Sequence, residues 1–498
     1  MSITTSDAKT PPDISPVSGK GRWLALAVIA VSQLLIVLDA TIVNIALPTA
    51  QVDLHISDAN RQWMITAYTL AFGGLLLLGG RIADFTGRKR AFIIGLLGFA
   101  AASALGGIAT NAVTLFSARA LQGAFGALMA PAALSLLTVT FTEAKDRARA
   151  FGVYGAIAGG GGAVGLLLGG VLTEYASWRW TLLVSAPIAI AAALAAVRFV
   201  GESRAEGNTR YDLPGAVTST LGLVALVYGF TKAADDGWDS PTTLGFLAVA
   251  ILLLVAFVVI ELRSSHPLLP MRVILDRNRG GAFLSALLIG AGIFGVFLFL
   301  TFYLQLTLGY SALMTGVAFL PFTFGIIAGA GLSAQLQTRV GPRVLMFGGM
   351  VLAAVGLVLL TRIGVDTGFW THVFPGLVVI SFGMGVTFGP MSNTALVGVA
   401  DHDAGVASAL INTTQQIGGS LGTALLNTIF TSAVAGYLAD RAAGAANPAV
   451  QQAATVHSYT VAFWVSAALI GVAALVALTL IRAGREEVSS NNAVPAGL

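Results

Sequence analysis

Asp39 and Arg119 are the two ionisable side chains that lie clearly inside apolar segments of this sequence. Asp39 stands within residues 24–48, a run of 25 residues with no other charged side chain. A carboxylate at membrane depth costs several kcal/mol, so such residues by default mark ion or proton pathways. The residues therefore predict reversible protonation of a buried carboxylate beside a cation. A static ion pair that fixes helix packing is the structural alternative.

The two charges are expected at similar depths in a membrane. If the chain enters from the cytosol, Asp39 lies about nine residues before the outer end of the first helix. Arg119 lies about five residues into the fourth helix. At a rise of roughly 1.5 Å per residue, these depths are ~14 and ~8 Å below the outer surface. We therefore expect Asp39 and Arg119 to interact across a shared cavity, where movement of Arg119 changes the proton affinity of Asp39.

The composition requires a membrane environment. Charged residues make up 10% and hydrophobic residues 56% of the chain, whereas soluble proteins have about 25% charged residues. Fourteen apolar segments reach the roughly 20 residues that a helix needs to cross the bilayer, and the last two cover residues 405–434 and 459–481. The alternating ten-residue strands of a membrane barrel are absent from the sequence. The fold class predicted is an all-α integral membrane protein with 14 transmembrane helices.

The distribution of basic residues predicts the orientation. With the N-terminus inside, segments on the cytosolic side hold 21 of the 27 Lys and Arg residues. The positive-inside rule then puts both termini in the cytosol, with the chain in the cytoplasmic (inner) membrane. The basic excess is topological and predicts no nucleic-acid partner. The sequence has no cysteine and no metal-ligand spacing among its five histidines, so we expect no metal site. We also expect no cofactor and no enzymatic activity.

A loop pattern occurs twice. Gly87 in the loop after the second segment aligns with Gly341 after the tenth, at an offset of 254 residues, and a chance match of short basic loops is the alternative. The offset predicts two six-helix halves with two inserted helices. Transporters built from two such halves bind their substrate at the interface near the bilayer midplane. The domains expected are a disordered cytosolic tail (1–20), a six-helix half (21–200), a linker with the inserted helices (201–278), a second half (279–484) and a tail (485–498).

Two helices are expected to carry polar faces. In the fourth, Arg119, Gln122, Gly123 and Gly126 fall on one side. In the thirteenth, a stripe of small and amide residues includes Asn412 and Gln416, with Gln415 at its edge. Amides in a membrane helix either hold helices together or line a wet cavity, and the sequence leaves both alternatives open.

Several motifs resemble a known family. Residues 38–48 (LDATIVNIALP), residues 63–68 (WMITAY) and the loop at residues 80–89 are similar to the first-helix, second-helix and loop motifs of one branch of the major facilitator superfamily. Arg119, Gln122 and Gly123 match the fourth-helix motif that holds the proton-coupling arginine of these fourteen-helix drug:proton antiporters. One departure is Leu166, which follows Gly165 where the family has a proline, so the usual kink is missing.

The resemblance implies proton-driven efflux of lipophilic or cationic small molecules, such as antibiotics, by alternating access. We expect a monomer whose partners are a small-molecule lipophilic substrate, protons and membrane lipids. Asp39 and Arg119 are the proton-coupling candidates. The other candidates are a substrate cavity (Asn44, Tyr68, Gln122, Asn412, Gln415, Gln416), a conformational switch loop (Gly80, Asp84, Gly87, Arg88, Lys89) and a helix-packing surface (Gly161, Gly165, Gly169).

Rival functions share this fold class. An exporter of lipids or other amphiphiles is the first, because a phenylalanine row could line a lateral opening: Phe294, Phe297, Phe299 and Phe302. A proton-coupled nutrient symporter is the second, and a membrane scaffold without transport is the third. Uptake and efflux in vesicles with an imposed pH gradient distinguish them.

Overall fold

The computed structural model describes residues 19–204, 212–265, 267–269, 271–399, 404–441 and 446–484. In these ranges the regular secondary structure is helical, and fourteen helical stretches are long and apolar enough to span a membrane. The predicted all-α membrane fold with fourteen spans is therefore confirmed. The C-terminal tail predicted over residues 485–498 lies outside the described residues. Residues 1–18 of the predicted N-terminal tail also lie outside them.

The first group of helices packs around one apolar core, which includes Phe92, Phe99 and Leu136. Asn111 caps one of its helices by accepting a hydrogen bond from the Thr114 N–H, which satisfies a backbone donor that the helix leaves free. The group consists of α1 (Gly19–Asp53), α2 (Trp63–Thr86), α3 (Arg88–Gly107), α4 (Ala112–Thr140), α5 (Ala144–Tyr175), α6 (Trp180–Leu183) and α7 (Ser185–Phe199).

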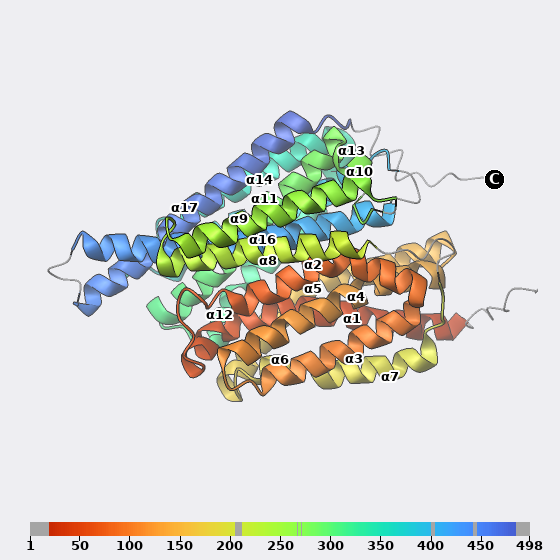
Figure 1. Cartoon of the computed structure of the whole chain (residues 1–498), viewed down its shortest axis with the longest axis horizontal. Coiled ribbons are helices and arrows are strands. Elements are labelled where there is room, and N and C mark those ends of the chain that lie inside the picture. Colours follow the sequence, from red (N-terminus) through yellow and green to blue (C-terminus); the bar gives the residue numbers. More distant parts are fainter. Residues whose placement is uncertain are drawn as a thin grey trace, which may run out of the picture.

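A second group follows the short α10 (Met271–Ile274) and lies beside the first (Figure 1). One predicted span is broken into α12 and α13, because Pro321 in the first turn of α13 cannot continue a preceding helix. The group consists of α11 (Arg277–Phe302), η1 (Tyr303–Thr307), α12 (Ala312–Ala318), α13 (Leu320–Val340), α14 (Pro342–Leu360), η2 (Phe369–Val373), α15 (Phe374–Leu396), α16 (Ala404–Ala439) and α17 (Pro448–Leu480).

The start of α1 and the end of α17 lie at the same end of the bundle (Figure 1). We call this the terminal end, and the loop at Gly87 belongs to it. The opposite end, which carries Asp53, Arg61 and Glu174, is the distal end. Each of the long helices connects these two ends, so a residue's position in its helix gives its depth in the bundle.

Two further helices, α8 (Leu213–Asp236) and α9 (Pro241–Arg263), lie between the groups in the chain. α8 contacts both α2 and α16. The Gln62 side chain before α2 donates a 2.8 Å hydrogen bond to Thr231 of α8, and Thr428 of α16 donates a 2.7 Å bond to the Phe230 carbonyl. The inserted pair is therefore attached to both groups.

Glycines bring neighbouring helices close together. A Cβ atom added to Gly123 of α4 would collide with the Tyr68 carbonyl of α2. On α5, Gly161, Gly165 and Gly169 all face α1, where an added Cβ would meet Val37, Thr41 and Ile42, respectively. The three glycines of the predicted helix-packing surface thus lie against α1. These approaches set the distance from α1 to α5 and from α2 to α4.

Candidate functional site

Asp39 and Arg119 form an ion pair in the interior of the first group. Arg119 Nη1 lies 2.6 Å from Asp39 Oδ2, and the two side chains are 2% and 0% exposed, respectively. The two side chains, predicted to interact across a shared cavity, are in direct contact, and their role in proton coupling stays a prediction. A charge-assisted hydrogen bond of this length is among the stronger polar contacts in proteins, and removing one partner would leave the other charge buried without compensation.

Gln122 completes the surroundings of the carboxylate. Its Nε2 donates to Asp39 Oδ1 at 2.9 Å and to Ser103 Oγ at 2.8 Å, while its Oε1 accepts from Arg119 Nη1 at 2.9 Å. Arg119 Nε donates to the Met64 carbonyl at 2.9 Å. Both carboxylate oxygens thus have a donor. Ser103 and Met64 were not predicted, because one hydroxyl in an apolar helix and one backbone carbonyl give no signal in the sequence.

The pair is enclosed on its other sides. The Tyr68 ring lies 4.6 Å from the Arg119 guanidinium carbon, in cation–π geometry. The cavity beside Arg119, lined by Val43 and Ala46 among others, holds about 10 Å³. Since a water needs roughly 10–15 Å³, this space takes one water molecule at most. Asp39 and Arg119 therefore face each other in a dry environment in this conformation.

The predicted cavity residues do not converge on one place. Tyr68 and Gln122 are buried in the ion-pair cluster, and Asn44 Nδ2 donates to the Ala40 carbonyl in its own helix at 2.8 Å. On α16, Asn412 is exposed, whereas Gln415 and Gln416 are half-buried. Gln416 also packs on Gly73 of α2, where an added Cβ would lie 2.9 Å from the glutamine Cβ. A substrate-binding role for these six residues stays a prediction.

The predicted switch loop is anchored to the end of α7. Asp84 pairs with Arg88 at 2.8 Å, but Lys89 Nζ donates to the Val197 carbonyl at 2.8 Å and does not join that pair. Gly87 has φ +115°, a conformation that favours glycine. Nearby, Gly80 faces Pro131 of α4.

Glu202 is a functional candidate that the sequence did not indicate. Its carboxylate accepts hydrogen bonds from the backbone N–H groups of Lys89 at 3.1 Å and Arg90 at 3.3 Å. These N–H groups start α3, where a helix has free donors and a partial positive charge that favours an anion. Glu202 lies more than 100 positions from this loop, so only the folded chain brings them together.

The distal end joins the two groups by hydrogen bonds. Asn427 of α16 donates to the carbonyls of Asp58 at 2.8 Å and Ala59 at 3.2 Å. One helical turn or more deeper, the hydroxyls of Thr69 and Ser420 are 2.7 Å apart. Three more contacts with atoms from both groups lie at this end: Gln305 with the Ile45 carbonyl, Glu174 with the Leu313 N–H, and Arg61 with Asn427. We call this set of contacts the distal seal.

Arg61 is the buried cation of the distal seal, with 2% of its surface exposed. Its guanidinium carbon lies 4.5 Å from the Phe302 ring centroid, 4.6 Å from that of Phe430 and 5.9 Å from that of Phe299. Its Nε donates to Asn427 Oδ1 at 3.2 Å. An arginine of the first group thus fills an aromatic cage made by the second, which favours the closed distal end.

The phenylalanine row that suggested a lateral opening is buried at Phe299 and Phe302 and half-buried at Phe294 and Phe297. Phe299 and Phe302 belong to the Arg61 cage. Phe297 contacts Phe319 and Phe322 with ring centroids 5.3 and 4.8 Å away, and Phe294 lies against Gly419 of α16. A lateral opening along this row stays a prediction.

Comparison with known proteins identifies the family. Residues 29–423 match the family model of the Major Facilitator Superfamily. The chain belongs to this superfamily. It is therefore a multi-pass membrane transporter and not an enzyme.

Its relatives within the superfamily include resistance and export proteins. The chain is 49% identical to the puromycin resistance protein pur8 of Streptomyces alboniger, over 97% of this chain and 99% of that one. It is 40% identical to the cephamycin export protein CmcT of Amycolatopsis lactamdurans, over 84% and 87% of the two chains. The multidrug efflux pump LfrA of Mycolicibacterium smegmatis is 34% identical, over 82% and 81%.

Solved structures support the superfamily fold. A bacterial homologue of the human lysosomal transporter Spinster, in an inward-facing and unoccupied conformation, superposes with a TM-score of 0.65 at 15% identity. The match covers 96% of this chain and 100% of that one. At this identity the likeness shows the fold alone.

Proposed function

We propose that this protein exports lipophilic or cationic small molecules, antibiotics among them, in exchange for protons. The names of its relatives support the cargo, since they include puromycin resistance, cephamycin export and multidrug efflux. The observation that carries the proton coupling is the buried contact of Asp39 with Arg119 and Gln122. Ionisable residues within membrane spans are rare and serve ion or proton pathways by default.

The Asp39–Arg119 pair and the distal seal support an alternating-access mechanism. In this conformation the distal seal is closed and Asp39 is paired in a dry site. Protonation of Asp39 removes the charge that attracts Arg119, and α1 and α4, which this pair joins, can then separate. Substrate release at the distal end therefore accompanies protonation of Asp39. Release of this proton at the terminal end then restores the ion pair of Asp39 with Arg119.

The protein works as a monomer in the cytoplasmic membrane, with both termini in the cytosol and the distal end outside. The distribution of basic residues supports this orientation, because the segments predicted on the cytosolic side hold 21 of the 27 Lys and Arg residues. Transport needs no cofactor. A proton entering under about 100 mV releases roughly 2.3 kcal/mol, with about 1.4 kcal/mol more per pH unit. This is enough to concentrate a solute by about two orders of magnitude.

Transport in proteoliposomes tests the proposal. Protein reconstituted with an imposed pH gradient should move puromycin toward the acidic side and release protons in the opposite direction. A symporter would move puromycin and protons in the same direction. Transport by a facilitator would not depend on the pH gradient. Gradient-independent movement of every tested substrate would overturn the antiport mechanism.

A further inference from the structure

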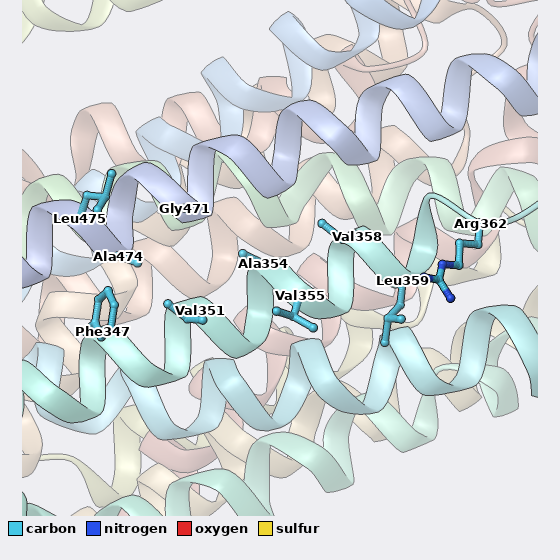
Figure 2. Close-up of a pocket in the computed structure, with 10 residues that line it drawn as sticks. All are labelled: Phe347, Val351, Ala354, Val355, Val358, Leu359, Arg362, Gly471, Ala474 and Leu475. Atoms are coloured by element: carbon cyan, nitrogen blue, oxygen red, sulfur yellow. The ribbon is translucent and has the colours of Figure 1, made fainter.

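A groove of about 530 Å³ runs along the seam between α14 and α17, on the outside of the second group. Figure 2 shows its lining residues along both helices, with Arg362 at one end and Phe347 and Leu475 at the other. Apart from Arg362 the lining is apolar. Val355 and Leu475 are 48% and 57% exposed without a bilayer. In a membrane this groove therefore faces lipid.

The hollow results from small residues at the seam. Gly471 of α17 has no side chain, and an added Cβ would meet nothing within 4 Å. Ala354 and Ala474, which also line the groove, have only a methyl group. The groove is therefore a gap that a flexible apolar ligand can fill without moving either helix.

The groove is long enough for an acyl chain. Its end residues on or just after α14, Phe347 and Arg362, are fifteen residues apart, which corresponds to ~22 Å along a helix. The hydrocarbon core of a bilayer is about 30 Å thick, so a groove of this length extends from the membrane interface past the bilayer midplane. Arg362 follows the end of α14 at Leu360, and the exposed Trp370 in η2 is at the same end. Tryptophan at this position is typical of the membrane interface.

Arg362 provides a cation at the level of the lipid headgroups. Within the part of the chain that the structure describes, no carboxylate forms an ion pair with it. Its side chain is exposed, and its planar guanidinium suits the oxygens of a phosphate. We propose that the groove binds an anionic phospholipid, with one acyl chain between α14 and α17 and the phosphate at Arg362. None of the residues of the Asp39 cluster lines this site.

Native mass spectrometry with added lipid tests this site. The wild type should retain one phosphatidylglycerol more firmly than phosphatidylcholine. Arg362→Gln should weaken phosphatidylglycerol binding roughly fivefold, which is the effect of one arginine near a charged membrane surface. Gly471→Leu fills the hollow and should reduce the binding of both lipids.

Matched controls separate the groove from general surface effects. Arg441→Gln removes another distal arginine, which stacks on Tyr437 away from the groove. Gly436→Leu adds the same side chain at a glycine of α16 that also has open space around it. Both controls should bind lipid like the wild type. Equal retention of the two lipids by the wild type, or equal losses in Arg362→Gln and Arg441→Gln, would overturn the proposal.

Discussion

Asp39 and Arg119 are 80 positions apart in the chain, yet the Arg119 guanidinium donates a 2.6 Å hydrogen bond to the Asp39 carboxylate. The glycine at position 123 lets α4 approach α2 closely enough for Arg119 Nε to reach the Met64 carbonyl as well. The pair therefore links three helices, and its charge state affects all of them.

Asp39→Asn should abolish proton-driven efflux while leaving the protein folded. Asparagine keeps the size of the side chain and a hydrogen bond to Gln122, but it cannot carry the proton. Efflux in proteoliposomes under a pH gradient measures the effect. Asp53→Asn, at the exposed end of the same helix, is the matched control and should retain transport. Unchanged gradient-driven efflux by Asp39→Asn would remove this residue from proton coupling.

Arg119→Ala should destabilise the protein by about 3–5 kcal/mol, because it leaves the Asp39 charge buried without a partner. The double variant with Asp39→Asn should recover part of this loss. Arg179→Ala breaks the half-exposed pair with Asp53 and should cost less than about 1 kcal/mol. Unfolding experiments in detergent measure the free energy of unfolding of the wild type, Arg119→Ala, the double variant and Arg179→Ala. A double variant no more stable than Arg119→Ala would contradict the electrostatic explanation.

Arg61→Ala should open the distal seal, since it empties the aromatic cage and removes the donor to Asn427 Oδ1. The chain has no cysteine, so a single Ala46→Cys beside the small cavity at Arg119 is a specific reporter. An impermeant maleimide added outside intact cells should label this cysteine about tenfold faster in the Arg61→Ala background. Arg441→Ala is the control, and equal rates in all backgrounds would show that Arg61 does not close this end.

Cysteines at Thr69 and Ser420 should lock the distal seal. The two hydroxyl oxygens are 2.7 Å apart, which brings the side chains into range for a disulfide. Oxidation should stop transport, and a reducing agent should restore it. Each single cysteine variant serves as a control. Full transport by the crosslinked protein would mean that α2 and α16 need not separate here.

Gly87→Ala should slow transport without changing substrate affinity. Alanine at φ +115° is strained by about 1–2 kcal/mol, and its Cβ would lie 2.9 Å from Glu202 Oε1. Asp84→Asn should have the same effect through the lost pair with Arg88. Gly201→Ala is the matched control, since an added Cβ there meets nothing within 4 Å. A parallel loss of affinity and rate would place the loop in the binding site.

The number of spans and the ion pair were predictable, because apolar length and an isolated carboxylate are local signals. The ends of the helices were less predictable from the sequence. α17 begins at Pro448, eleven residues before the predicted span, since its first turns are polar and extend past the hydrocarbon. The Asn447 cap and Pro448 were the available signals, because proline is favoured at the first helical position.

The distal seal was not predictable from one sequence. In the sequence, Arg61 is not distinguishable from an ordinary basic residue of a loop. Its burial depends on Phe302 and Phe430, which are more than 200 positions away in the chain. Asn427 and Glu202 likewise gain their roles only through long-range packing. Periodicity within one helix indicates which face is polar, but it does not identify the helix that covers this face.

The length of the last two helices has a practical consequence for imaging. α16 has 36 residues and α17 has 33, so each is roughly 50 Å long, well beyond the ~30 Å hydrocarbon core. Their distal ends project from the bundle in Figure 1. A 51.0 kDa transporter in a detergent micelle offers few features for particle alignment. An antibody fragment raised against this helical projection would supply a rigid fiducial for electron cryomicroscopy.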